Sequence, residues 1–138
     1  MPVPSLDATI ERFLQSVALE NYPPLHTLLP DEARAILAGI QSGECLRFEA
    51  DSEDYTIIGG PAGEIALRII RPRELSGPLP VVLFFHGGGW VLGDRDTHDR
   101  VVREIAVGAQ ATVVCVEYAR APETPYPVAI EQAYSATR

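Results

Sequence analysis

The sequence predicts an α/β fold, because two apolar runs in its second half are separated by an amphipathic helix. The first run, residues 81–85, is unbroken and is typical of a strand that is buried on both faces. Residues 96–109 keep one helical face apolar behind Asp96, the expected N-cap. The second run spans residues 112–116. Strand, helix and strand form a βαβ unit, whose strands run parallel and are joined by a right-handed crossover.

The N-terminal segment predicts two helices. Apolar residues recur at helical spacing over residues 7–19, with Asp7 as the N-cap, and the prolines at 23–24 break this helix. A second helix is expected to begin at residues 30–32, where a proline and two acids suit a first turn. Residues 1–45 are therefore assigned to a helical segment that precedes the sheet.

Strands replace helices after residue 45. Residues 46–58 and 65–70 have the pattern of two strands, and the glycine-rich residues 59–63 supply a turn between them. These two strands predict an antiparallel pair. Together with the βαβ unit they assign residues 46–138 to the core of the fold.

The end of the sequence predicts an incomplete fold. A last helix is expected from Pro127, and no residue that stops a helix precedes Arg138, so Arg138 is expected to lie in mid-helix. A sheet with an unpaired apolar edge also invites association. We therefore expect an incomplete, truncated fold, whose partner is the missing portion of the fold or a second copy of the chain.

Composition indicates one globular domain and excludes several partners. The chain has 138 residues, of which 46% are hydrophobic, and its formal net charge of -8 would repel nucleic acids and anionic lipids. No apolar stretch approaches the ~20 residues that span a bilayer, and no secretory signal begins the chain, so we expect a cytoplasmic protein. Cys115 reads as a buried core thiol rather than a disulfide partner of Cys45. No metal site or cofactor is expected.

The segment most indicative of chemistry is His86-Gly87-Gly88-Gly89-Trp90, directly after the first apolar run. Three consecutive glycines cost backbone entropy, and their use is a backbone that takes unusual angles and approaches a ligand closely. In open α/β sheets, ligands bind in the crevice beyond the carboxyl ends of the strands. The backbone amides of this segment are therefore the candidate functional groups.

Two further motifs accompany this segment. They are Gly93-Asp94 followed by Thr97-His98-Asp99, and Glu117-Tyr118-Ala119-Arg120-Ala121-Pro122-Glu123 followed by Pro127. Together the three resemble the hormone-sensitive-lipase branch of the α/β-hydrolases, the bacterial family IV carboxylesterases, over residues 54–138. The resemblance implies the N-terminal portion of an α/β-hydrolase fold, with residues 1–45 similar to the helical N-terminal cap of that family. It also implies hydrolysis of short-chain carboxylic esters.

The resemblance assigns a role to each residue of the segment. The amides of Gly88 and Gly89 would stabilise the oxyanion of the tetrahedral intermediate, and Gly87 would let the loop turn. His86 would order the loop rather than act as the base, because the family's triad follows in the order Ser, Asp or Glu, His beyond this loop. Trp90 either walls the substrate pocket or belongs to the core.

Other polar residues have simpler structural interpretations. His98 and Asp99 are expected to cap and solvate the start of a helix, and His26 to lie in a surface linker. The family more often reads Y-R-L-A-P-E, whereas this chain has Ala119 in place of the arginine and Arg120 in place of the leucine. Whether this chain keeps an ion pair formed by the family's arginine is therefore left open. Residues 121–123 are interpreted as a structural turn.

No nucleophile is found in the chain, because none of its serines lies in G-x-S-x-G. Three interpretations stay open. The favoured one is a carboxylesterase whose Ser-His-Asp/Glu triad lies beyond residue 138, so that the chain alone is inactive. The others are a non-catalytic small-ligand module on the same fold, and a phosphate-binding domain that uses the glycines as an anion cradle.

Overall fold

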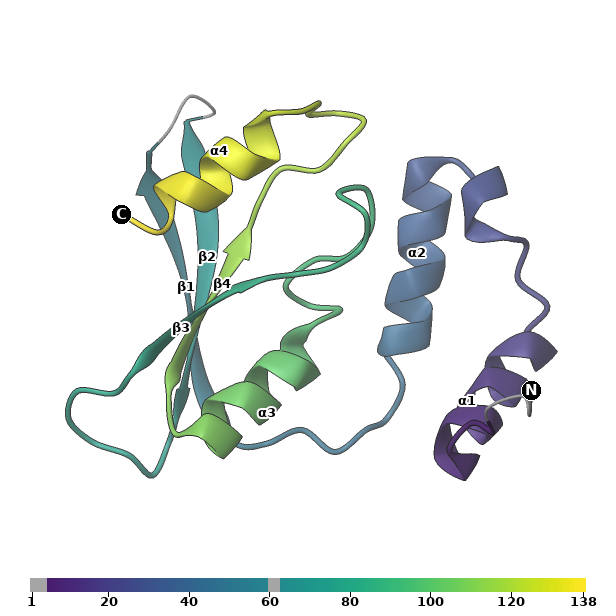
Figure 1. The fold of residues 1–138 in the computed structure, drawn as a ribbon, viewed down its shortest axis with the longest axis horizontal. Coiled ribbons are helices and arrows are strands. Elements are labelled where there is room, and N and C mark those ends of the chain that lie inside the picture. Colours follow the sequence, from purple (N-terminus) through teal and green to yellow (C-terminus); the bar gives the residue numbers. More distant parts are fainter. Residues whose placement is uncertain (1–4, 60–62) are drawn as a thin grey trace.

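The computed structural model describes residues 5–59 and 63–138, which form a four-stranded sheet with helices around it (Figure 1). The elements are α1 (Ala8–Leu19), the short 3-10 helix η1 (Leu25–Thr27), α2 (Pro30–Gln41), β1 (Ala50–Ile58), β2 (Glu64–Pro72), β3 (Val81–Phe85), α3 (Asp99–Ala109), β4 (Thr112–Glu117) and α4 (Val128–Ser135). Among these residues no helix is both long and apolar enough to cross a membrane. The α/β class predicted from the sequence is confirmed.

The strands lie in the order β1-β2-β4-β3. β1 and β2 pair antiparallel, and β3 and β4 pair parallel across the helix α3, so both predicted strand units are confirmed. β2 also pairs antiparallel with β4, which joins the two units into one sheet. The predicted turn between β1 and β2 includes residues 60–62, which lie outside the described residues.

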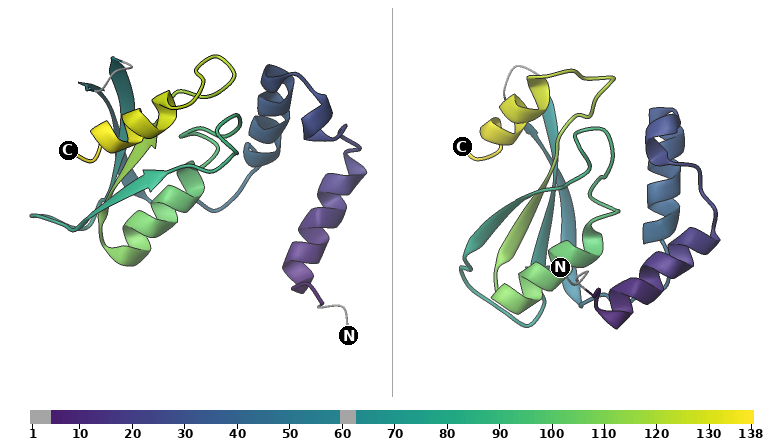
Figure 2. Two further views of the ribbon diagram at one scale, coloured as in Figure 1. Left: turned by 45° about the horizontal axis from the view of Figure 1, so that its top comes forward. Right: turned by 45° about the vertical axis from the view of Figure 1, so that its right-hand side comes forward.

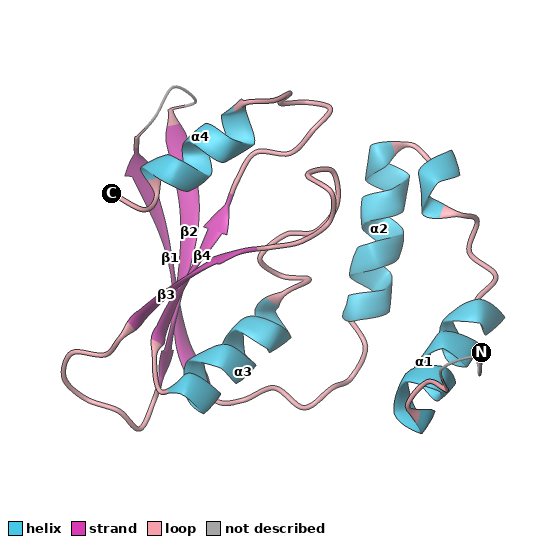
Figure 3. Cartoon of the chain, viewed as in Figure 1, coloured by secondary structure: helices cyan, strands magenta, loops and turns pink. Residues whose placement is uncertain are grey.

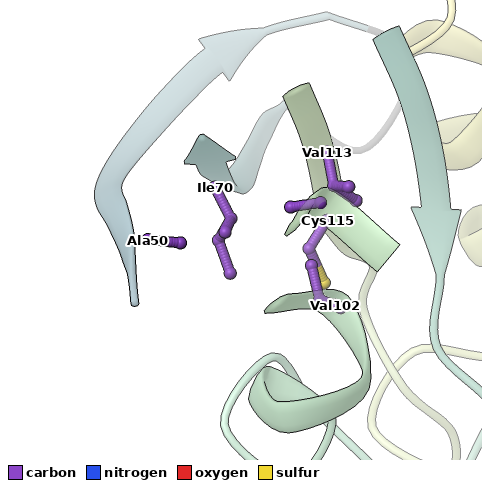
Figure 4. Close-up of a cluster of buried hydrophobic side chains, with 6 residues drawn as sticks. Ala50, Ile70, Val102, Val113 and Cys115 are labelled. Carbon is purple, nitrogen blue, oxygen red and sulfur yellow. The ribbon is translucent and has the colours of Figure 1, made fainter. Parts of the chain in front are cut away.

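Alternate residues of the central strands bury opposite faces of the sheet. On one face, Ile70 and Val113 pack with Cys115 against the α3 residues Val102 and Ala106 (Figure 4). The other face is buried by a second cluster, which consists of Ile65, Leu67 and Val116 with Ala136 beside them. Both cysteines are free, and Cys115 is buried as expected.

β3 differs from the prediction because only one of its sides is covered. It lies at the edge of the sheet, and Val81, Leu83 and Phe85 are 63%, 36% and 40% exposed. The intervening residues Val82 and Phe84 pack against the α3 face. Burial on both faces, as expected from the unbroken apolar run, is therefore wrong, because the described residues cover the face that carries Val81, Leu83 and Phe85 only in part.

The start of α3 also differs from the prediction. The helix begins at Asp99 with His98 as the N-cap residue, and Asp96 lies outside the helix, where it pairs with Arg68 at 2.6 Å. Asp94, rather than Asp96, is the acid that caps backbone amides before this helix. Its carboxylate accepts from the backbone amides of Asp96 and Thr97 at 3.1 and 2.8 Å.

Asp99 is buried rather than solvated. Its carboxylate accepts from Arg103 at 2.8 Å one helical turn later. The ion pair compensates the burial of both charges.

α4 ends within the chain. Its last helical residue is Ser135, and Ala136 is its C-cap, so the expectation that Arg138 lies in mid-helix is wrong. The final turn is closed by hydrogen bonds from the amides of Thr137 and Arg138 to carbonyls one turn earlier. Such bonds end a helix without glycine or proline.

The helix α2 lies beside the loops that leave β3 and β4, rather than on a face of the sheet (Figures 1 and 3). Both views in Figure 2 keep α2 next to these loops, and the left view shows α1 farther from the sheet. Asp7 caps α1 as predicted, since its side chain accepts from the amide of Thr9. The prediction that residues 1–45 form a separate cap segment stays a prediction.

Candidate active site

The glycine loop, residues 86–93, leaves the carboxyl end of β3 and lies beside the loop that follows β4 (Figure 1). The two loops touch directly, because the amide of Ala121 donates to the carbonyl of Trp90 at 2.8 Å. This is the edge of the sheet at which open α/β folds bind ligands. The predicted functional segment therefore lies at a suitable position.

The glycine loop turns through a run of left-handed backbone angles. The φ values are +128° at Gly88, +62° at Gly89 and +60° at Trp90, whereas Gly87 has no such angle. The carbonyl of Gly88 accepts from the amides of Val91 and Leu92 at 3.2 and 2.9 Å, which closes the turn. A Cβ atom at Gly88 would lie 2.0 Å from the Leu92 carbonyl oxygen, so only glycine fits there.

The amides of Gly88 and Gly89 donate to no acceptor in residues 5–59 and 63–138. Both glycines line a cavity of about 300 Å³, together with Phe85, Tyr118 and Ile130. Gly88 and Gly89 are exposed, so their amides are open to the solvent that fills this cavity. Two adjacent amides without protein partners beside a cavity are therefore available to a ligand oxygen.

His86 is packed as a structural support for the start of the loop. It is 3% exposed and stacks on the Tyr118 ring, with the ring centroids 4.2 Å apart. The Tyr118 hydroxyl donates to the His86 carbonyl at 2.6 Å, and His86 Nδ1 lies 3.0 Å from the Gly87 carbonyl oxygen. His86 Nε2 is buried without a hydrogen-bond partner among the described residues. In the described part of the chain no carboxylate forms a hydrogen bond with this imidazole, as the orientation of a catalytic base would require.

Burial lowers the pKa of the His86 imidazole below its ordinary value of 6.5, although the Gly87 carbonyl opposes the shift. We expect its ring resonances in an NMR titration to show a midpoint below 6.5. As pH falls through 6.5 the unfolded chain takes up this proton before the folded chain, so His86 lowers the free energy of unfolding there. A titration midpoint above 6.5 would contradict the neutral, loop-supporting role.

Trp90 faces solvent rather than the core. Its side chain is 59% exposed and lines a second cavity of about 410 Å³ with Tyr126, Pro127 and Ile130. The two cavities lie side by side at the glycine loop, since Gly89 and Trp90 line both of them. Trp90 is therefore not packed in the core of this structure, which was one of its two interpretations.

A protein-family model described as the alpha/beta hydrolase fold matches residues 82–138, which include the glycine loop, α3, β4 and α4. Residues 82–138 therefore belong to the α/β-hydrolase family. The resemblance read from the glycine segment and the motif after β4 is thereby confirmed.

Curated relatives with similar sequences are named as esterases. The chain is 41% identical over 122 residues to carboxylesterase NlhH of Mycobacterium tuberculosis, which covers 87% of this chain and 38% of the relative. It is 58% identical over 83 residues to esterase LipI of the same organism, which covers 59% of this chain and 26% of the relative.

Solved esterase structures match nearly the whole chain. A thermostable esterase from Pseudomonas putida ECU1011 superposes with a TM-score of 0.90 at 40% identity, covering 99% of this chain and 43% of that one. A hyperthermophilic esterase from the archaeon Pyrobaculum calidifontis superposes with a TM-score of 0.76 at 34% identity, covering 99% and 42%. The chain thus spans 26–43% of the length of these four relatives.

The α/β-hydrolase motif after β4 departs from the common pattern at Ala119 and Arg120, and the structure gives Arg120 a partner. Its guanidinium donates to the carbonyl of Gly93 and lies 3.7 Å from the Asp94 carboxylate. A Cβ atom at Gly93 would lie 2.3 Å from the Gly87 carbonyl oxygen. Arg120 and Gly93 therefore hold the C-terminal end of the glycine loop against its start.

Sequence reasoning missed Arg34 of α2, which reaches both loops of this α/β-hydrolase site. Its side chain is 15% exposed and contacts the carbonyls of Val91 and Ala121 and the carboxylate of Glu123. No local pattern singles out an arginine on an amphipathic helix, so this residue could be found only from the structure.

The remaining histidines and acids do not assemble another site. His98 opens α3, with Nδ1 3.1 Å from the Asp94 carbonyl oxygen, and His26 is exposed in η1. Within the described ranges, no group of three or more His, Cys, Asp or Glu residues is placed to hold a metal ion.

Proposed function

We propose that this chain provides the oxyanion hole of a carboxylic ester hydrolase that acts on short-chain esters. The observation that carries the proposal is that the amides of Gly88 and Gly89 find no acceptor among the residues that the structure describes and lie beside a cavity. The backbone at Gly88 is one that only glycine adopts. The printed names of the relatives, carboxylesterase and esterase, support the same reaction class.

In the proposed reaction, a serine hydroxyl attacks the ester carbonyl carbon and the carbonyl oxygen becomes an oxyanion. The two amides donate to that oxygen, and each preorganised donor at about 2.7–3.1 Å contributes about 3–4 kcal/mol to stabilising the transition state. His86 and Gly87 support the loop. Trp90 forms one wall of the cavity that receives the acyl or alcohol part of the ester.

The serine, its histidine base and the acid that orients the histidine are proposed to come from a segment beyond residue 138. This placement follows the chain order of α/β-hydrolases, in which the triad comes after the oxyanion loop. The edge position of β3 supports it, because an unpaired strand edge readily pairs with a further strand. Residues 46–138 would then be the first part of the core, and residues 1–45 part of its cap.

Hydrolysis of p-nitrophenyl acetate tests this proposal. We expect no turnover above buffer by the 138-residue chain, and turnover once a segment carrying G-x-S-x-G and the rest of the triad is joined to it. Turnover by the chain alone would contradict the proposal. Small-molecule binding without turnover in the extended protein would instead favour the non-catalytic ligand module.

Anion binding by the glycines is less well supported. Residues 90–98 separate Gly89 from the first residue of α3, so the glycines do not open a helix. That first residue is Asp99, an acid, and its carboxylate would repel a phosphate.

A further inference from the structure

The Arg34 side chain uses every donor it has. Nε donates to the Val91 carbonyl at 2.8 Å, and Nη2 donates to the Ala121 carbonyl at 2.9 Å. The two Nη atoms also form a bidentate pair with the Glu123 carboxylate, both at 2.8 Å, and Nη1 donates to Asp31 at 2.9 Å. A guanidinium has five N–H groups, and all five are engaged here.

The acceptors belong to two loops that meet at the candidate oxyanion hole. Val91 follows Gly88, Gly89 and Trp90 in the glycine loop, and Ala121 lies in the loop after β4. The amide of Ala121 already donates to the Trp90 carbonyl at 2.8 Å. Arg34 therefore spans the same junction from the side of α2.

The Glu123 carboxylate orients the guanidinium for these two carbonyl contacts. Its hydrogen bonds from Arg34 lower its pKa to about 2, so it is charged at every pH at which the protein would work. The Glu123 side chain is 56% exposed, which means that the ion pair itself adds little stability in water. Its main effect is geometric, since a bidentate pair holds the planar guanidinium in one orientation.

We propose that Arg34 is a positioning residue, which ties the helix α2 to the glycine loop and to the loop after β4 and so holds the oxyanion donors in place. The catalytic part of this inference rests on the proposed function. The helix α2 is then part of the scaffold of the active site, and Arg120 holds the same loop two residues later, at Gly93. Lysine cannot replace Arg34, because one ammonium cannot reach two carbonyls and a carboxylate in a fixed plane.

Residue-level hydrogen exchange on the 138-residue chain tests the structural part. In Arg34→Met, we expect the amides of Ala121, Val91 and Leu92 to exchange at least about tenfold faster, since bonds from a charged donor are lost. The amides of β4 and α3 should keep their rates. Arg34→Lys should recover little protection, whereas Glu123→Gln should fall between Arg34→Met and the parent, because both carbonyl contacts remain.

Arg73→Met is the matched control, because Arg73 is 56% exposed and pairs only with Glu49 and Asp51 among the described residues, far from the glycine loop along the chain. It should change none of the three loop amides. Unchanged exchange of these amides in Arg34→Met, or equal acceleration of every amide in the chain, would overturn the proposal. The second outcome would mean that Arg34 supports only global stability.

The catalytic part is tested in the protein extended by its triad segment. Arg34→Met should lower kcat for p-nitrophenyl acetate about 10- to 100-fold with KM within about twofold, because misplaced donors affect the transition state more than the bound ester. A loosened loop with unchanged kcat would overturn the positioning role. If the extended parent protein itself hydrolyses no ester, the proposed function fails, and the exchange measurement still decides whether Arg34 orders the loop.

Discussion

Replacing Gly88 with alanine is expected to lower kcat for p-nitrophenyl acetate about 100- to 1000-fold in the extended protein, the usual effect of losing one oxyanion donor. Gly88 has a φ of +128°, and an added Cβ would lie 2.0 Å from the Leu92 carbonyl oxygen and 2.4 Å from its carbon. These are backbone atoms that cannot rotate away, so the turn must open. Opening it moves the amides of Gly88 and Gly89 away from the cavity.

The matched control is Gly108→Ala. Gly108 lies in α3 with a helical backbone, and a Cβ there would meet nothing within 4 Å. We expect this variant to keep the parent kcat, since alanine favours a helix over glycine. Equal kcat values for Gly88→Ala and the parent would show that the glycine loop does not stabilise the transition state.

The largest expected effect on stability comes from Ile70 on β2. Its side chain is fully buried between Ala50 on one side and Val113 and Cys115 on the other, on the face that α3 covers (Figure 4). Ile70→Ala should lower the free energy of unfolding by about 2–5 kcal/mol, because it removes buried methyl groups and leaves a cavity. The urea midpoint of the 138-residue chain measures this change.

Two further variants keep this measurement interpretable. Ile70→Val should cost about 0.5–1.5 kcal/mol, which keeps the effect measurable if the alanine variant does not fold. Ile58→Ala, at an 88% exposed position on β1, should stay within about 0.5 kcal/mol of the parent. An Ile70→Ala midpoint equal to that of Ile58→Ala would contradict the assignment of this cluster as the core.

The elements of the fold could be predicted from the sequence because each depends on local patterns. Apolar alternation and turn residues indicate the β1 and β2 pair, and the apolar runs around α3 indicate the parallel pair. The pairing of β2 with β4 could not be predicted, because strands that are not consecutive carry no local signal of their register. The exposure of β3 was missed for the same reason, since it depends on which strands lie beside it.

Of the candidate site, only the unusual backbone conformation of the glycine loop could be predicted from the sequence. A run of glycines after a strand indicates special backbone angles, and the structure has such angles at Gly88 and Gly89. The supports of the loop are tertiary contacts. Arg34 and Val91 lie 57 positions apart, and only the placement of α2 beside the loop brings them together.

The most direct test of the central claim is the position of a bound oxyanion analogue. An organophosphate that reacts with the proposed serine of the extended protein leaves a phosphoryl oxygen where the oxyanion would form. A crystal structure of that adduct should place this oxygen about 2.7–3.1 Å from the amide nitrogens of Gly88 and Gly89. An oxygen that is instead held by donors outside the glycine loop would contradict the claim that this chain provides the oxyanion hole.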